Sequence, residues 1–283
     1  SHEVFVCPES CMRGVVLTAA EIHAMDRFTC IFITHEDVIS GNCEQLVIDG
    51  VSEMLAGLSK RPRAISVFTC CLDQFIGTDH EYIYGTLRQR FPDVGFIECY
   101  MNPTMRKTMS PDTRMRRQLF SLLKPSPNKR KAVNFIGSNA PLLPDNEFIR
   151  LLRDSEYETL HIANCRSFAE YEQMSASVLN ILIHPSGEAA VNALEERLGQ
   201  KMLKIPLSYD FAEIDQAMKE LAAALHLVPA DTAALKVEAE AVLRQVATKL
   251  DNMPVAIDDT ATSRPFGLAK LLCEYGNLAR PKG

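Results

Sequence analysis

Two pairs of cysteines stand where apolar segments end, near the start of this 283-residue chain. Cys7 and Cys11 enclose the short segment CPESC, and Cys70 and Cys71 end the segment AISVFTCC just before a glycine turn. A thiolate binds iron or zinc, attacks electrophiles or forms a disulfide, whereas a protonated thiol behaves as a small core residue. The residue types and their spacing alone leave packing, a disulfide, catalysis and metal binding open.

The chain holds nine cysteines, and most of them lie in its first hundred residues. The cysteines of that region are Cys7, Cys11, Cys30, Cys43, Cys70, Cys71 and Cys99. Because no secretory leader is recognisable, we expect a reducing cytoplasmic location, in which cysteines remain thiols or metal ligands. A disulfide between neighbours in sequence would be strained. No CxxC pair of the kind found in structural zinc sites is present.

The composition is that of an ordinary globular protein, with 47% hydrophobic and 23% charged residues. The net charge of -6 does not favour nucleic acid or an anionic membrane as a partner. No apolar run reaches the roughly 18 residues of a membrane span. The phosphate-binding patterns GxxxxGK[ST] and GxGxxG are both absent, so we expect no nucleotide on this chain.

Short apolar segments alternate with amphipathic ones along the chain, which is typical of an α/β fold with parallel sheets. Strands are expected at 2–6, 28–34, 63–70, 94–100, 132–137, 158–165, 178–185, 201–208 and 254–259. Helices are expected at 8–25, 34–58, 80–91, 113–123, 145–156, 187–199, within 211–250 and at 266–276. Asp145 is expected to cap one helix, and Gly199 to end another.

The charged, proline-bearing segment 124–131 is the clearest candidate for a boundary between domains. It divides a first α/β domain at 1–124 from a second, Rossmann-like domain at 131–210. The remaining residues, 211–283, predict long helices and then the strand and helix that begin a third unit. The fold class we expect is therefore a tandem of Rossmann-like α/β units with parallel sheets, the third unit being truncated.

The two cysteine pairs are expected at positions where ligands and thiolates are favoured. Cys11 falls in the first turn of the helix expected at 8–25, where the helix dipole lowers a thiol pKa. Cys71 stands at the carboxyl end of a strand, the edge at which parallel sheets bind ligands. Adjacent residues of a strand face opposite ways, so we expect one of Cys70 and Cys71 to face a site and the other to face the core.

Three motifs then relate the chain to a known family. VCPESC keeps the proline and the final cysteine of an HGPxGC loop, and THEDVISGNCEQL matches T-E-x-D-x-[IV]-F-G-G with Thr34 and Gly41. Cys71 precedes Gly77 of an IGxD turn by six residues. In these features the chain resembles nitrogenase component 1 and its relatives, the dark-operative protochlorophyllide reductase subunits and the nickel-sirohydrochlorin reductive cyclase. Segments 133–152, 177–208 and 253–276 follow the family's second and third domains in order.

The resemblance implies an iron–sulfur cluster, of the [4Fe–4S] type, held by Cys11 and Cys71. Cys7 stands where the motif has a glycine and is the candidate for a further ligand, with Cys43 and Cys99 in reserve. In a two-fold dimer, Cys11 and Cys71 of both subunits would supply the four thiolates that such a cluster needs. The subunit would be a homodimer or would pair with a related chain.

The implied function is that of an oxidoreductase subunit that passes electrons from an ATP-dependent iron–sulfur reductase to a bound small molecule, such as a tetrapyrrole. One departure from the family disfavours nitrogen reduction, because LNILIHPSGEAA lacks the cysteine that holds the iron–molybdenum cofactor and offers only His184. An alternative is a noncatalytic scaffold or carrier of a metal cluster or metallocofactor. A binding protein that has lost its cluster is a third reading.

Overall fold

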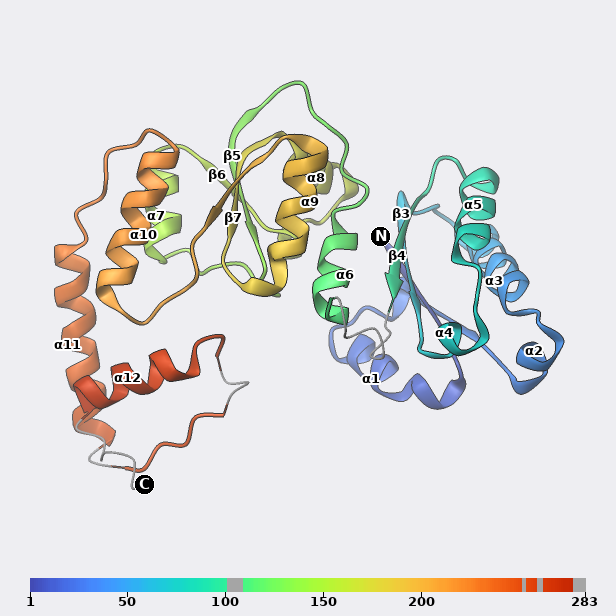
Figure 1. Cartoon of the computed structure of the whole chain (residues 1–283), viewed down its shortest axis with the longest axis horizontal. Coiled ribbons are helices and arrows are strands. Elements are labelled where there is room, and N and C mark those ends of the chain that lie inside the picture. Colours follow the sequence, from blue (N-terminus) through green and yellow to red (C-terminus); the bar gives the residue numbers. More distant parts are fainter. Residues whose placement is uncertain (101–108, 251–252, 259–261, 277–283) are drawn as a thin grey trace. The chain divides into compact units, whose positions relative to one another are not determined.

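The computed structural model describes residues 1–100, 109–250, 253–258 and 262–276, which form two compact units (Figure 1). The first unit comprises Ser1–Asn128, Asn164–Ala176 and Ser186–Gln200, and the second comprises Lys129–Ala163, Ser177–Pro185 and Lys201–Gly283. The chain first passes from one unit to the other inside the segment 124–131. Both units are discontinuous in sequence, whereas the domains expected from the sequence, 1–124, 131–210 and 211–283, are continuous.

The first unit is built on a sheet of four parallel strands in the order β2-β1-β3-β4. The strands are β1 (His2–Cys7), β2 (Phe28–Phe32), β3 (Ala64–Thr69) and β4 (Gly95–Tyr100). All four were expected from their apolar sequences, and their parallel pairing confirms the predicted fold class. Each strand is followed by a helical segment, as parallel crossover connections require.

One face of this sheet carries the main core of the unit. Helices α3 (Cys43–Gly57) and α5 (His80–Arg90) contribute buried residues to that core, together with alternate residues of the strands such as Val4, Val6 and Val67. The connection after β1 consists of the short helical turn η1 (Glu9–Cys11) and helix α1 (Arg13–Glu21), of which only Ala19 is buried. One face is therefore closely packed, and α1 contributes little buried surface.

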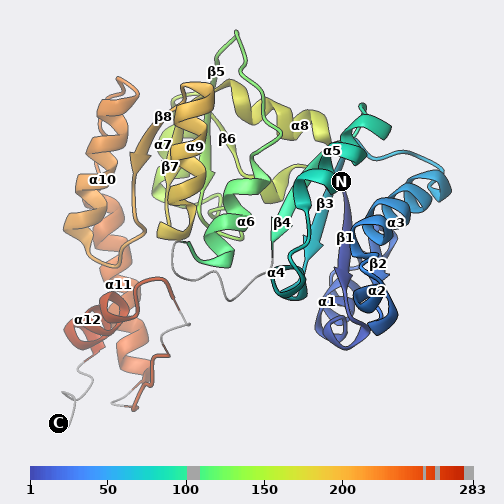
Figure 2. The same ribbon diagram turned by 45° about the vertical axis from the view of Figure 1, so that its right-hand side comes forward.

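Short helices gather at the carboxyl end of the first sheet, as two views of the ribbon show (Figures 1 and 2). They are α1, α2 (His35–Ser40) and α4 (Leu72–Ile76). We expected one helix at 34–58, but Gly41 adopts the left-handed conformation, with φ of 68°, and separates α2 from α3. Thr34 begins α2 in a reciprocal capping box with Asp37.

Helix α6 (Pro111–Leu119) follows β4 and packs on both β4 and α9 (Glu188–Leu198). The Arg197 guanidinium of α9 donates hydrogen bonds to three carbonyl oxygens just after α6, those of Phe120, Ser121 and Leu123. Helix α8 (Phe168–Gln173) is also held to this region, because the Tyr171 hydroxyl donates to the Leu119 carbonyl at 2.9 Å. These contacts are why α8 and α9 belong to the first unit despite their place in the sequence.

The second unit contains another four-stranded parallel sheet, in the order β6-β5-β7-β8. Its strands are β5 (Arg130–Ile136), β6 (Glu158–Leu160), β7 (Ser177–Leu182) and β8 (Lys201–Lys204). The buried Asn134 side chain donates to Asn180 and accepts from the Ser177 hydroxyl, which satisfies three polar groups inside the sheet. Both sheets thus have the same pattern of strand order.

Helices α7 (Glu147–Asp154) and α10 (Phe211–Ala224) contribute buried apolar residues to the core of the second unit. The N-cap of α7 is Asn146, whose side chain accepts from the Phe148 amide, so the expectation of Asp145 as the cap was wrong by one residue. Gly199 does end α9 in the left-handed conformation, as predicted.

Helices α11 (Ala233–Leu250) and α12 (Pro265–Gly276) complete the second unit and lie against each other. The strand expected at 254–259 is not formed by residues 254–258, and its last residue lies outside the described residues. Within the described ranges, none of the helices combines the length and the apolar character that crossing a bilayer would require.

Candidate functional site

The carboxyl ends of β1 and β3 lie side by side at the point where the strand order of the first sheet reverses. From β1 the chain moves to β2 on one side, while β3 and β4 continue on the other. Connections on the two sides of such a switch point diverge, and open α/β sheets bind ligands in the resulting crevice. Cys7 is the last residue of β1, and the pairing of Val6 with Thr69 makes Cys70 the next residue beside it.

Cys7 lies on the face of the sheet that carries three phenylalanine rings. The ring of Phe5 stacks on that of Phe68, with centroids 4.4 Å apart, and lies 5.1 Å from that of Phe28. Because side chains alternate along a strand, Cys7 continues the face of Phe5. This is the face opposite the packed core that includes Val4, Val6 and Val67.

The thiols at this edge lie close enough together to influence one another electrostatically. Burial raises the pKa of the Cys7 thiol to about 12, with smaller contributions from Cys70, Cys11 and Cys30. Burial also raises the pKa of Cys70; Asp73, Cys71 and Cys11 add to it, while a hydrogen bond from the Leu72 amide opposes it. Cys7, Cys70 and Cys71 lie at the ends of β1 and β3, and bringing several thiolates together there would require a compensating positive charge.

The two predicted ligands Cys11 and Cys71 lie in the connections that follow β1 and β3. Cys11 is exposed and ends the turn η1, and its amide donates to the Pro8 carbonyl at 2.9 Å. We expected Cys11 in the first turn of a helix, but it precedes α1. Cys71 is half-buried and forms the N-cap of α4, without a side-chain capping bond.

Cys7, by contrast, is buried at the end of β1. Its side chain is 5% exposed, and its sulfur lies 2.8 Å from the sulfur of Met12, which is itself 3% exposed. Cys70 is half-buried, like Cys71. Alternation left open which of the two faces a site, and the six-residue spacing to Gly77 selected Cys71.

The reserve ligands Cys43 and Cys99 are both buried. Cys43 begins α3, is 3% exposed and belongs to the main core, where burial raises its pKa. Cys99 lies within β4, is fully buried, and burial raises its pKa to about 12. Both behave as protonated core thiols, which pack as small apolar residues.

Behind the Cys70–Cys71 loop lies a buried polar group of side chains. The Asp73 carboxylate is 7% exposed and accepts from Thr69, and one of its oxygens lies 3.6 Å from Nε2 of His80. Burial raises the pKa of Asp73, partly opposed by the hydrogen bond from Thr69 and the charge of His80. Asp73 Oδ2, His80 Nδ1 and the Tyr84 hydroxyl are buried without a hydrogen-bond partner. The loop is thus backed by polar groups instead of by an apolar core.

The donor set at the edge suits a soft metal or an iron–sulfur cluster. Thiolates are the ligands that such groups prefer. Within the described parts of the chain, no group of three or more Cys, His, Asp or Glu side chains is arranged to hold a single metal ion. A cluster differs from an ion because each thiolate binds a separate iron atom, so its ligands need not converge on one point. The residues fit a cluster better than a single ion.

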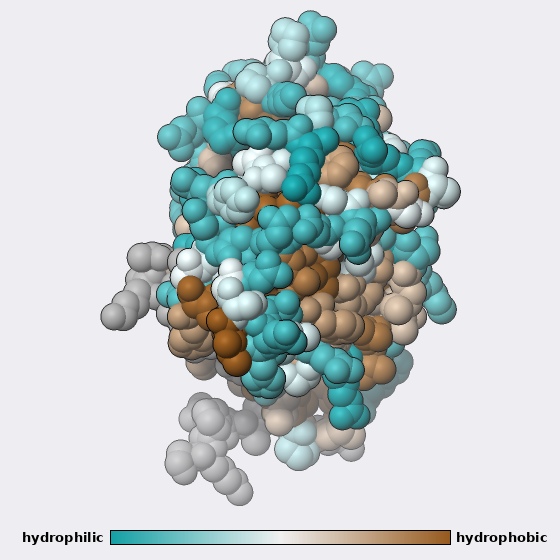
Figure 3. Space-filling model, turned by 90° about the vertical axis from the view of Figure 1, so that its right-hand side faces the viewer, coloured by the Kyte–Doolittle hydropathy of each residue, from teal (hydrophilic) through white to brown (hydrophobic). Residues whose placement is uncertain are grey.

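Exposed apolar side chains surround the same edge. Ile39 of α2 is 87% exposed, Phe75 of α4 is 73% exposed and Phe32 at the end of β2 is 45% exposed. The space-filling view likewise shows hydrophobic patches among hydrophilic residues on the face that it presents (Figure 3). Exposed apolar side chains of this size near one site are typical of a surface that another protein covers.

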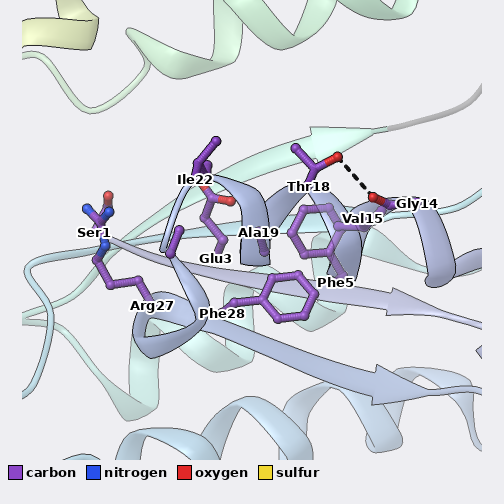
Figure 4. A pocket seen from close by; sticks show the side chains of 11 residues that line it. Ser1, Glu3, Phe5, Gly14, Val15, Thr18, Ala19, Ile22, Arg27 and Phe28 are labelled. Carbon is purple, nitrogen blue, oxygen red and sulfur yellow. Dashed lines mark hydrogen bonds between the residues drawn. The ribbon is translucent and has the colours of Figure 1, made fainter.

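A cavity of about 340 Å³ lies on the same face of the first sheet as Cys7 but nearer the amino end of β1. Its lining includes Phe5, Phe28 and the side of α1 that carries Thr18, whose hydroxyl donates to the Gly14 carbonyl (Figure 4). The described residues that line it include no cysteine. The cavity is therefore distinct from the cysteine edge.

The larger cavity, of about 1010 Å³, lies in the second unit beside α10 and α11. Its walls are mainly apolar, and Asp215 on its rim is engaged by Lys219 at 2.6 Å and by the Thr232 hydroxyl at 2.8 Å. The described lining offers no cysteine or histidine as a redox or metal ligand. The candidate site therefore lies in the first unit and not in the larger of these two cavities.

Comparison with known proteins identifies the family. The family description "Nitrogenase component 1 type Oxidoreductase" matches residues 2–278. No curated protein matches the sequence. Two solved structures share the fold: nitrogenase Cp1 at pH 6.5 has a TM-score of 0.73 and 12% identity over 97% of this chain, and nitrogenase Cp1 at pH 5 has a TM-score of 0.58 and 14% identity over 89%.

The chain spans 65% of the first of these nitrogenase chains and 52% of the second. The likeness to them concerns the fold, since the identities are low. The family description, in contrast, covers nearly the whole sequence, including both cysteine loops. The chain therefore belongs to the nitrogenase component 1 type oxidoreductases.

Proposed function

We propose that this chain is an electron-transferring oxidoreductase subunit that holds an iron–sulfur cluster, of the [4Fe–4S] type, at the carboxyl edge of its first sheet. Cys11 and Cys71 are its thiolate ligands. The electrons come from an ATP-dependent iron–sulfur reductase in the cytoplasm and pass to a small unsaturated molecule such as a tetrapyrrole. The observation that carries the proposal is the meeting of two cysteine-bearing loops at the switch point between β1 and β3.

The loops would keep the ligands in place through their backbone bonds. The amide of Cys11 donates to Pro8, which makes η1 a closed turn, and Gly77 ends α4 in the left-handed conformation, with φ of 71°. The Asp79 amide donates to Glu44 at 3.0 Å and ties the segment after α4 to α3. A bound cluster supplies one-electron transfer, while the protein holds the ligands and sets the polarity around them.

A second chain completes the site in this proposal. Two thiolates from one subunit satisfy half of the ligands of a [4Fe–4S] cluster, so a two-fold or pseudo-two-fold partner supplies the rest. The exposed side chains of Phe32, Ile39 and Phe75 support this arrangement, because they surround the edge where that partner would dock. Docking would also remove water from Cys11, which is exposed in the single chain.

A second candidate is a carrier that delivers a cluster or metallocofactor to another protein. The exposure of Cys11 favours it, since a cluster with an accessible ligand is more easily transferred than a buried one. The two candidates differ in what happens to the iron. An electron-transfer subunit keeps its cluster through cycles of reduction and oxidation, whereas a carrier loses it to an acceptor protein that lacks iron.

The test is anaerobic reconstitution of the chain with ferrous iron and sulfide, followed by iron analysis and EPR of the dithionite-reduced protein. We expect about four irons per two chains and a reduced [4Fe–4S] signal, both lost in Cys11→Ala. The matched control is Cys273→Ala, whose exposed thiol lies in α12. Iron at background level in the wild-type protein would refute the proposal. Transfer of the iron to an acceptor lacking it would establish the carrier instead.

A further inference from the structure

The cavity beside α1 has an apolar end and a charged end. Its volume is about 340 Å³, and its walls come from α1 and from the face of the first sheet that carries Phe5 and Phe28. Only Ala19 of α1 is buried, so the helix covers this face without filling the space beneath it. Ligand pockets occupy about 300–1,000 Å³, and a cavity at the lower end of that range suits a molecule of the size of an amino acid.

The apolar end is built around two aromatic rings. The rings of Phe5 and Phe28 are tilted by 41° with centroids 5.1 Å apart, and the α1 wall adds Val15 and Ala19. Aromatic rings attract one another at centroid distances of about 4.5–7 Å in tilted or offset arrangements, so these two can accept a third. An apolar side chain, above all an aromatic one, matches this end of the cavity.

An acid and a base lie together at the other end. Glu3 pairs with Phe28 in the adjacent strand, and Arg27 directly precedes Phe28, so the two charged residues are neighbours where β1 and β2 begin. Both line the cavity, and Figure 4 shows them on the side away from Gly14. Burial raises the pKa of the Glu3 carboxyl, and the charge of Arg27 opposes that shift, which is consistent with their closeness.

These two charges select the kind of ligand. The Arg27 guanidinium lies 3.9 Å from Asp26, but both side chains are exposed, so this pair is weak and can be exchanged. A ligand with only an ammonium group would bring a second positive charge beside Arg27, and one with only a carboxylate would bring a second negative charge beside Glu3. A zwitterion satisfies both, because its ammonium donates to the Glu3 carboxylate and its carboxylate accepts from the guanidinium.

We propose that this cavity binds a free amino acid with an apolar, preferably aromatic, side chain. Glu3 binds the ammonium group, Arg27 binds the carboxylate, and the side chain lies against Phe5 and Phe28. The site is separate from the cysteine edge, and the proposal does not depend on the proposed function. Because the ligand fills the space that α1 leaves open, its binding stabilises α1 on the sheet.

The first experiment measures the binding of L-phenylalanine to the whole chain by isothermal titration calorimetry, beside three probes that each lack one part of it. Phenethylamine lacks the carboxylate and 3-phenylpropionate lacks the ammonium group, and we expect each to bind about tenfold more weakly or worse. Glycine lacks the ring, and we expect it not to bind. Equal affinity for L-phenylalanine and for either singly charged probe overturns the proposal, as does the absence of L-phenylalanine binding at millimolar concentration.

The second experiment locates the site with Glu3→Gln and Arg27→Gln, each of which should weaken L-phenylalanine binding about tenfold. The matched controls Glu21→Gln and Arg13→Gln remove exposed charges of α1 outside the described lining and should bind as the wild type does. Wild-type affinity in either site variant overturns the proposal. Hydrogen exchange of the wild-type protein decides the matter if a variant does not fold. Bound L-phenylalanine should raise protection in residues 13–28, and unchanged protection there, or a rise confined to α10 and α11, overturns the proposal.

Discussion

Gly137 follows β5 directly at the switch point of the second sheet, and we predict that Gly137→Ala destabilises this unit strongly. Its φ is +117°, a conformation that residues with a side chain rarely adopt, at a cost of about 1–3 kcal/mol. A Cβ atom would also lie 2.6 Å from the His184 carbonyl oxygen and 2.9 Å from the His184 amide nitrogen. Both atoms are backbone, and the neighbouring bond from the Ile183 amide to Ile136 restricts their movement.

Relieving that overlap adds about 1–3 kcal/mol, so the total loss is about 2–6 kcal/mol. Urea denaturation with an m value of about 2 kcal/mol/M would then show a fall of the midpoint by about 1–3 M. Hydrogen exchange assigns the loss to the right unit: protection should fall in residues 130–138 and 177–184 and remain unchanged in β1 and β3. Gly14→Ala is the control, because a Cβ there meets nothing within 4 Å, and alanine favours a helix by about 1 kcal/mol. An unchanged midpoint for Gly137→Ala would show that the close approach to His184 does not select glycine.

Two further predictions concern polar contacts. Arg197→Ala should lower the free energy of unfolding of the first unit by about 1–3 kcal/mol, because the guanidinium donates to three carbonyl oxygens. Arg197→Lys should be intermediate, since an ammonium cannot match that geometry. Equal urea midpoints of the wild type and Arg197→Ala would contradict this role. The hydrogen bond from Lys270 and the amides of Ala212 and Glu213 lower the pKa of Asp210, the N-cap of α10. Its charged form therefore stabilises the fold above the unfolded-state pKa of about 3.9, and this contribution disappears as the pH falls through the lowered folded-state value. Asp210→Asn should accordingly melt below wild type at pH 7 but converge with it toward pH 2, and a difference that stayed constant with pH would refute the assignment.

The alternation of strands and helices could be predicted from the sequence because buried parallel strands are continuous apolar runs. The segments 64–68 and 132–136 are mostly apolar, and both lie in strands. Two of the errors lie where the sequence allowed more than one local structure. Asp145 and Asn146 are both good N-caps, and the backbone geometry selected Asn146. Gly41 was visible as a breaker, yet the apolar residues on both sides of it suggested a single helix.

The site was harder to predict than the fold because it depends on strand order. The sequence shows that Cys7 and Cys70 end strands, but it does not show that β1 and β3 are neighbours. That pairing, with Val6 opposite Thr69, decides which sulfurs meet. The choice of Cys71 over Cys70 relied on the six-residue spacing to Gly77, which reflects the shape of the loop more than the direction of a thiol.

The residues that carry the family resemblance have identifiable structural roles in this chain. Thr34 and Gly41 begin and end α2, while Gly77 ends α4 and Asp79 caps α5 by accepting from the Tyr82 amide. These residues specify short helices at the carboxyl edge of the sheet and therefore the paths of the loops. They do not specify the direction of each sulfur.

A motif of this kind can thus persist while the ligand set changes, because the loop keeps its shape when a neighbouring residue becomes a cysteine. Cys70 is such a neighbour, since it adds a sulfur beside Cys71 without altering the turn at Gly77. The number of thiolates that this chain offers is consequently a property of its own sequence, not of the family pattern. Measuring the bound iron and the EPR signal of the Cys7, Cys70 and Cys71 variants would show which thiolates this chain uses and whether they are those that the family pattern predicts.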